Sequence, residues 1–281
     1  MLTTLLHERA EVVGVVSDED RGLNSDYADL VPICEKYSVP ILLTRDINSS
    51  ETLEWIKGYS PDIIFCMGWS RLLKKELLYL LPMGVIGYHP AELPMNRGRH
   101  PLVWALVLGM KSTASTFFFM NEGADSGDIL SQRPIKISDE DDASTLYVKM
   151  VNVAKSQIVE ILPALSSGNF RRIAQDESKA NVWRKRGTKD GEIDWRMSAQ
   201  SIHNLVRGLT YPYVGAHFMK NERRYTVWKT KIVESLELEN IEPGKVIDYS
   251  SHGNAIVKCA DGCIELVDIE PPIDISKCDY L

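Results

Sequence analysis

The sequence has few cysteines, no long apolar run and no excess of positive charge. Its five cysteines are an odd number, and Cys259 and Cys263 have no second pair at the spacing of a zinc site, which argues against a disulfide framework. They are typical of reduced thiols, so we expect a cytoplasmic protein. No stretch is long and apolar enough to span a bilayer, and the first nine residues lack a secretion signal, so we expect no membrane partner.

The overall charge argues against polyanions as partners. The net charge is −7 over 281 residues, so the chain as a whole is not built to bind a polyanion. Apolar residues make up 44% and charged residues 25%, which is ordinary for a globular protein. The length allows one large domain and one small domain.

Apolar runs predict an α/β fold. Buried strands are expected over residues 12–16, 39–43, 62–67 and 116–120, and a long amphipathic helix over 144–162. Ser50 is expected to cap a helix that ends at Lys57, and Ser198 a helix that ends at Arg207 before Gly208. The short β runs that follow, separated by turn residues, predict a small barrel.

Two segments carry the residue types that acid–base chemistry needs. His89 follows the apolar run Val85–Ile86 and opens the segment His-Pro-Ala-Glu-Leu-Pro, and Asp125 lies inside Gly-Ala-Asp-Ser-Gly at 123–127. A carboxylate beside an imidazole orients the ring and stabilises its charged form. Either residue alone would more often be structural, since a histidine after a strand or an aspartate in a turn is common.

The ordered combination of segments is more specific. After His89–Pro94 come Asn96-Arg97-Gly98-Arg99, then Pro101-Leu102-Val103-Trp104-Ala105, and then Gly123–Gln132. This pattern resembles the formyltransferase family, which transfers a formyl group from 10-formyltetrahydrofolate to an amine. The resemblance extends over nearly the whole chain, because residues 191–281 are similar to the small C-terminal domain of that family.

The resemblance implies an architecture. We expect an open, mostly parallel Rossmann-like sheet in a catalytic domain over 1–165, a linker over 166–190, and a small β-rich, OB-like domain over 191–281. The family has one more strand before the helix expected at residues 2–9. We therefore expect that the natural start lies upstream and that the first strand is missing here, which would expose the edges of both neighbouring strands.

The resemblance also implies the roles of particular residues. His89 would stabilise the developing oxyanion and help move the amine proton, and Asp125 would relay that proton. Contacts with the folate are implied for the loop after the third strand and for the segment before Asp125, namely for Trp69, Ser70, Arg71, Leu72, Glu122 and Ala124. Trp69 and Leu72 fit an ordinary core face equally well.

One position departs from the family pattern. Members usually have Asn two residues before the histidine, where its amide binds the formyl oxygen, and this chain has Gly87. Loss of one such donor typically costs about 10²–10³ in rate. We hypothesise that Asn96, seven residues after His89, supplies the amide; the alternative is that Asn96 only shapes a turn.

The distribution of charge along the chain indicates the class of acceptor. Residues 170–190 contain seven Lys/Arg against three Asp/Glu, whereas 191–281 contain ten against fourteen. An acidic C-terminal domain favours a nucleotide-linked amino sugar over methionyl-tRNA, because phosphate contacts dominate nucleic-acid affinity. A folate-binding hydrolase or a degenerate, non-transferring member also fits Gly87.

The sequence also limits metals and assembly. His89, His100 and Asp125 lie too far apart in sequence, with no pair on one helix face, to indicate a metal site, so we expect no metal. The oligomeric state is left open, a homodimer included.

Overall fold

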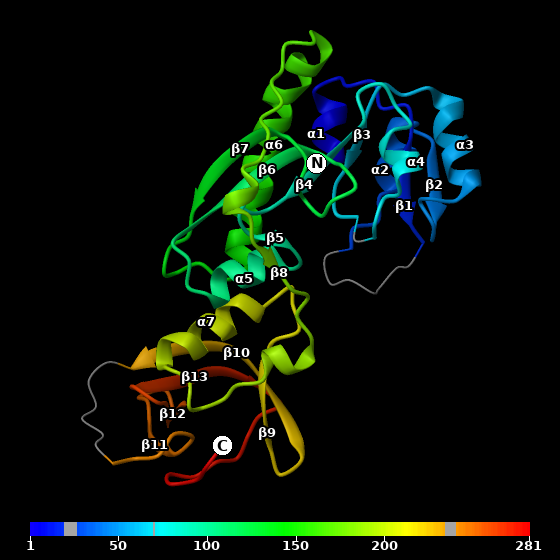
Figure 1. The fold of residues 1–281 in the computed structure, drawn as a ribbon. Helices are drawn as coiled ribbons and strands as arrows, with labels where there is room; N and C mark the ends of the chain where they lie inside the picture. The colour runs from blue at the N-terminus through cyan, green and yellow to red at the C-terminus, as the bar shows by residue number, and fades with distance from the viewer. Residues whose placement is uncertain (20–26, 70, 234–239) are drawn as a thin grey trace. The chain divides into compact units, whose positions relative to one another are not determined.

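The computed structural model describes residues 1–19, 27–69, 71–233 and 240–281. Contacts divide the chain into two compact units. The first unit contains Met1–Pro101, Thr113–Ile135 and Val148–Trp183, and the second contains Leu102–Ser112, Lys136–Tyr147 and Arg184–Leu281 (Figure 1). The helices are α1 (Leu2–His7), α2 (Val31–Tyr37), α3 (Ser50–Tyr59), α4 (Lys75–Leu78), α5 (Pro101–Val107), α6 (Ala143–Ser166) and α7 (Ala199–Leu209).

The strands of the first unit are mostly parallel. β1 (Val15–Asp18) pairs in parallel with β2 (Ile41–Thr44), and β3 (Ile64–Cys66) pairs in parallel with β4 (Val85–His89). The second sheet has the order β3-β4-β6-β7, where β6 (Ser112–Phe119) runs antiparallel to β4 and β7 (Ile129–Lys136) follows it. The expected α/β class is therefore confirmed.

Helices bury the apolar face of this sheet. Leu5 of α1 and the α6 residues Ala154 and Ile158 form one core with Ile86 of β4 and Phe117 of β6. Ile86, Phe117, Ala154 and Ile158 have no exposed surface, which stabilises the sheet by the removal of apolar area from water. β4 is therefore fixed from its start up to the histidine at its end.

Two expected boundaries of the first unit are wrong by a few residues. The cap of α3 is Ser49, whose side chain accepts a hydrogen bond from the Thr52 amide, so Ser50 is the first helical residue. The first strand starts at Val15 rather than at residue 12, because pairing with β2 begins where the Val15 amide donates to the Pro40 carbonyl at 2.9 Å.

The second unit contains a five-stranded antiparallel sheet, which agrees with the expected β-rich domain. Its strand order is β11-β12-β13-β10-β9. The strands are β9 (Ala216–Lys220), β10 (Arg223–Val233), β11 (Val246–Tyr249), β12 (Ala255–Lys258) and β13 (Cys263–Glu270). Helix α7 packs on this sheet through Ile202 and Val206. Ser198 caps α7 as expected, but the helix continues through Gly208 to Leu209.

Short elements occupy the segment that the sequence predicts as a linker. They are η1 (Glu177–Lys179), β8 (Val182–Trp183) and η2 (Thr188–Gly191). β8 pairs in parallel with β5 (Arg97–Gly98), the short strand that follows His89 by eight residues. Part of this segment therefore belongs to the first unit and lies beside the histidine loop.

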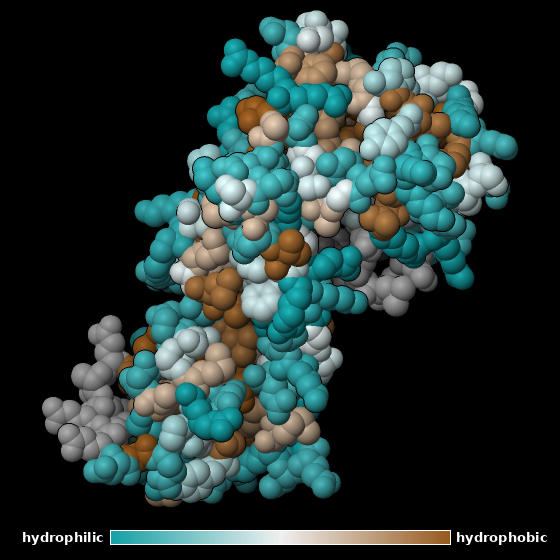
Figure 2. Space-filling model, viewed as in Figure 1, coloured by the Kyte–Doolittle hydropathy of each residue, from teal (hydrophilic) through white to brown (hydrophobic). Residues whose placement is uncertain are grey.

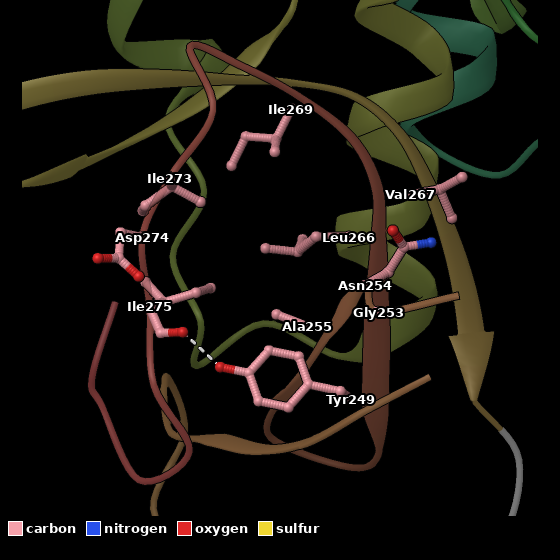
Figure 3. Close-up of a pocket in the computed structure, with 10 residues that line it drawn as sticks. All are labelled: Tyr249, Gly253, Asn254, Ala255, Leu266, Val267, Ile269, Ile273, Asp274 and Ile275. Atoms are coloured by element: carbon pink, nitrogen blue, oxygen red, sulfur yellow. Dashed lines mark hydrogen bonds between the residues drawn. The ribbon is translucent and has the colours of Figure 1, made fainter. Parts of the chain in front are cut away.

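A cavity of about 170 Å³ lies in the second unit (Figure 3). Leu266 and Ile269 point into it, and the Tyr249 hydroxyl donates to the Ile275 carbonyl at its edge. None of the residues predicted for the site lines this cavity. The surface that is visible in Figure 2 is largely polar and is interrupted by patches of apolar side chains.

The cysteines give the first testable prediction. Burial raises the pKa values of the Cys66 and Cys259 thiols to about 12, so both stay protonated and unreactive at pH 8. Cys34, Cys259 and Cys263 are buried, Cys66 is partly buried, and Cys278 is exposed. We expect Ellman's reagent to label one of the five thiols rapidly in the native protein and all five in guanidinium chloride. Cys278→Ser should abolish the rapid phase; rapid labelling of Cys66 would contradict this burial.

Candidate active site

His89 is the last residue of β4 and is only 4% exposed. Its Nε2 lies 2.7 Å from the carbonyl oxygen of Asn96. A carbonyl can only accept a hydrogen bond, so Nε2 carries a proton and donates. The second ring nitrogen, Nδ1, is therefore the position at which the neutral imidazole can take up a further proton.

Asp125 faces that second nitrogen. Its Oδ2 lies 3.6 Å from His89 Nδ1 and accepts a hydrogen bond of 2.9 Å from the Gly98 amide. The 3.6 Å separation is longer than an ordinary N–H···O hydrogen bond. The His–Asp pair that the sequence predicts is thus brought together, and the Gly98 amide anchors the same carboxylate oxygen that faces His89.

The loop between β6 and β7 brings Asp125 to this position. β6 is antiparallel to β4, so its last residue pairs with Ile86, away from His89, which pairs with Thr116. The chain then folds back, and the Phe119 amide donates to the Asp128 carbonyl at 2.8 Å. Asp125 itself has a φ of 52°, in the left-handed region that aspartate and asparagine tolerate better than most residues.

The histidine loop is anchored at two further points. The Thr116 hydroxyl donates to the Ala91 carbonyl at 2.7 Å, and the Gln132 amide donates to the Leu93 carbonyl at 2.9 Å. Both anchors come from β6 and β7. The loop is therefore held by the same sheet that positions His89.

Asn96 lies in this loop, is 8% exposed and has a φ of 63°. Its backbone carbonyl holds the imidazole. Within the described residues its side-chain amide makes no hydrogen bond, so the amide is available to a ligand. The hypothesis that this amide replaces the missing donor stays a prediction, while the alternative role in shaping the loop also fits the left-handed backbone.

The space beside Gly87 is filled by apolar side chains. A Cβ at this position would lie 2.8 Å from Met120 Cγ and 2.9 Å from Cε1 and Cζ of Phe118, which is 2% exposed. Any side chain at residue 87 would have to displace this packing. The amide that family members carry there therefore has no room in this chain.

A stability prediction follows for Gly87→Asn. Overpacking of this kind typically costs about 1–3 kcal/mol, so the urea midpoint should fall by a corresponding amount. Gly58→Ala is the matched control, because Gly58 lies in α3 with nothing within 4 Å of its added Cβ. Alanine favours helix over glycine, so the control should raise the midpoint slightly. A Gly87→Asn protein as stable as wild type would contradict the filled space.

The residues expected to contact the folate lie in two loops. Trp69 follows β3, its Nε1 is buried, and among the described residues it has no hydrogen-bond partner. Arg71 pairs with Asp18 at 2.8 Å, and Leu72 is 70% exposed. Glu122 and Ala124 are exposed in the loop that carries Asp125, and Ser70 lies outside the described residues. Their contacts with folate stay predictions.

The arginine that follows Asn96 is paired with a carboxylate of the chain itself. Arg97 is 6% exposed, and its guanidinium donates two hydrogen bonds to Glu177, at 2.9 and 2.7 Å. This contact raises the pKa of Arg97 and lowers the pKa of Glu177. No group of three or more His, Cys, Asp or Glu that could hold a metal occurs in the described part of the chain.

Two linker amides that sequence reasoning passed over, Gln175 and Asn181, contact the loops that carry Asp125 and Asn96. They stand among other polar residues, and nothing in the sequence distinguishes them.

No helix in the described ranges is long and apolar enough to cross a membrane.

Comparisons with known families match most of the chain. The family model for formyl transferase matches residues 3–162, and the model for the formyl transferase C-terminal domain matches residues 186–276. Together the two matches include His89, Asp125 and the five-stranded sheet.

Solved structures share the fold at low sequence identity. HypX from Aquifex aeolicus in complex with tetrahydrofolic acid is 18% identical, with a TM-score of 0.68 over 92% of this chain and 44% of that chain. This chain thus spans less than half the length of HypX. An N-formyltransferase from Helicobacter canadensis, in complex with folinic acid and dTDP-3-aminofucose, is 14% identical (TM-score 0.72; 94% and 93%). Methionyl-tRNA formyltransferase from Clostridium thermocellum is 18% identical (TM-score 0.62; 89% and 100%).

Proposed function

Because this chain belongs to the formyl transferase family, we propose that it transfers a formyl group from 10-formyltetrahydrofolate to the amine of a nucleotide-linked amino sugar. The observation that carries the proposal is the buried His89 with its Nδ1 3.6 Å from the Asp125 carboxylate. Such a pair can hold a proton beside a reacting amine.

The protons of His89 define what the pair can do. Nε2 is committed to the Asn96 carbonyl, so a proton released by the amine is taken up at Nδ1. Asp125 faces that atom and stabilises the imidazolium by its charge. The charged ring in turn stabilises negative charge that develops on the formyl oxygen.

The formyl donor is a substrate that two loops are suited to hold. When bound, 10-formyltetrahydrofolate supplies the formyl carbon that the amine attacks. The buried, unpartnered Nε1 of Trp69 is a donor without an acceptor among the described residues, which fits a polar ligand at the loop after β3. Trp69, Ser70, Arg71 and Leu72 would hold it from this loop, and Glu122 and Ala124 from the loop that carries Asp125. The tetrahydrofolic acid and folinic acid in the HypX and Helicobacter canadensis structures support a folate as the formyl donor.

The acceptor is assigned from charge. Several linker cations already contact groups of the protein: Arg184 donates to Asp190, Lys179 pairs with Asp176 at 3.3 Å, and Arg172 lies 3.6 Å over the Phe119 ring. The hydrogen bond from Arg184 holds the pKa of Asp190 well below its usual range, so this pair stays ionised. These acidic partners offset part of the positive charge that the linker would offer to the phosphates of a tRNA, which favours the sugar acceptor.

The experiment must also distinguish two alternative functions. Methionyl-tRNA is the acceptor if affinity for initiator tRNA is strong and depends steeply on salt. A folate-binding hydrolase or a degenerate member is favoured by Gly87, because the usual amide donor is absent and its space is filled.

The deciding experiment measures release of tetrahydrofolate from 10-formyltetrahydrofolate. It is run without an acceptor, with a panel of nucleotide-linked amino sugars, and with methionyl-tRNA, each beside a His89→Ala protein. Release that depends on one sugar and is lost in His89→Ala supports the proposal. Dependence on the charged tRNA, release without an acceptor, or folate binding without release would favour the tRNA enzyme, the hydrolase or the degenerate member respectively.

A further inference from the structure

The segment 175–183 contacts both loops of the candidate site. The Arg97 amide donates to the Asn181 carbonyl at 3.1 Å, and the Arg99 amide donates to the Trp183 carbonyl at 3.0 Å. The approach is close enough that a Cβ on Gly98 would lie 2.3 Å from the Trp183 carbonyl oxygen, and Gly98 has a φ of 101°. Glycine at residue 98 is therefore required for this segment to lie where it does.

Asn181 acts on the histidine side. Its Oδ1 accepts a hydrogen bond of 2.6 Å from the backbone N–H of Asn96. The backbone carbonyl of Asn96 in turn accepts the 2.7 Å hydrogen bond from His89 Nε2. Asn96 has a left-handed backbone, which asparagine tolerates better than most residues and which this hydrogen bond holds in place. Asn181 thus fixes the peptide unit that orients the imidazole.

Gln175 acts on the aspartate side. Its amide nitrogen donates to the carbonyl of Asp125 at 2.8 Å and to that of Gly127 at 2.6 Å. Its Oε1 accepts from Arg97 Nε at 3.1 Å and Nη2 at 2.8 Å. One side chain thereby joins the loop that carries Asp125 to the buried arginine next to Asn96.

We propose that Asn181 and Gln175 are positioning residues that set the distance between His89 and Asp125, an inference that rests on the proposed function. Their side chains bond backbone groups of the two loops and the Arg97 guanidinium, and not the side chains of His89 or Asp125. Asn181 holds the backbone of Asn96, whose carbonyl binds the His89 ring, and Gln175 holds the backbone of Asp125. Both Asn96 and Asp125 have left-handed backbones. Loss of either anchor lets one half of the pair move, and a misplacement of about 1 Å can cost about 100-fold in rate.

Variants of each residue separate the hydrogen bond from the bulk of the side chain. Asn181→Ala should lower kcat about 10-fold to 100-fold with KM for the donor nearly unchanged. Asn181→Asp keeps an oxygen acceptor for the Asn96 amide and should restore most of kcat. Gln175→Glu should lower kcat at least as much as Gln175→Ala, because a carboxylate would face the two carbonyl oxygens that now accept from the amide. Lys179→Ala, on the exposed part of the same segment, is the control.

A second readout does not depend on catalysis. In protein labelled with ¹⁵N-histidine, the His89 Nε2–H proton should give a slowly exchanging signal, assigned by its absence in His89→Ala. Asn181→Ala should broaden this signal or speed its exchange, and Asn181→Asp should preserve it. Urea midpoints show whether each variant is folded.

The outcomes distinguish the two proposals. If folded Asn181→Ala and Gln175→Ala proteins keep wild-type kcat and an unchanged imidazole signal, the positioning role is overturned. If the wild-type protein transfers no formyl group, but the signal depends on Asn181, then the proposed function fails and the positioning of His89 stands. A shift in the urea midpoint alone, with kcat and the signal unchanged, would mean a structural role only and would also overturn the inference.

Discussion

Replacement of His89 by alanine is expected to slow formyl transfer by about 10²–10⁴-fold, the usual contribution of a positioned acid–base group. The imidazole is buried, its Nε2 is fixed by the Asn96 carbonyl, and its Nδ1 faces Asp125. The fall should appear in kcat, measured by tetrahydrofolate release with the acceptor that the wild type uses.

His89→Gln tests which property of the ring matters. Its side-chain amide can still donate to the Asn96 carbonyl but cannot take up a proton. We therefore expect a loss close to that of His89→Ala. His252→Ala, in an exposed turn of the second unit, is the matched control and should keep wild-type turnover. A glutamine variant with near wild-type kcat would mean that the ring acts only as a hydrogen-bond donor.

The histidine and the aspartate could be paired from the sequence because each stands in a recognisable segment. His89 ends an apolar run, and Asp125 lies between glycines. Their partners could not be predicted. The Asn96 carbonyl and the Gly98 amide are backbone groups, and every residue carries such groups whatever its side chain.

The segment after α6 shows why side-chain composition misleads. Residues 170–190 carry seven cations, a pattern that favours a solvated linker. In the structure, β8 instead pairs with β5, and Arg97 is buried against Gln175 and Glu177. Strand pairing over two residues leaves no periodic pattern in a sequence, so it is visible only once the register is known.

The packing around Gly87 could not be predicted either, because it too depends on the strand register. The sequence shows that the amide is missing, but not what takes its place. Pairing of Gly87 with Phe118 and of Cys66 with Gly87 sets the packing there, and both registers depend on the whole sheet. The glycine and the two bulky side chains therefore form one packing unit, and an amide side chain at residue 87 would have to displace Phe118 or Met120.

Asp125→Asn is expected to lower kcat by on the order of 100-fold, as the second large effect. Asparagine is the informative replacement because it tolerates the φ of 52°, whereas alanine would also strain the backbone. Its oxygen can still accept the hydrogen bond from the Gly98 amide. The change therefore removes the negative charge opposite His89 Nδ1 while the loop keeps its anchors.

Comparison of Asp125→Asn with His89→Ala shows what the negative charge of Asp125 does. If Asp125 acts by stabilising the imidazolium, Asp125→Asn should affect kcat far more than KM or the urea midpoint. The double variant with His89→Ala should then be no slower than His89→Ala alone, because residues that act as one unit are not additive. Asp128→Asn, which changes a charge in the same loop and keeps the backbone hydrogen bond from Phe119, is the control. Additive losses in the double variant would mean that Asp125 acts on the substrate independently of the imidazole, and the 3.6 Å pair would then be two separate contacts rather than one proton-handling unit.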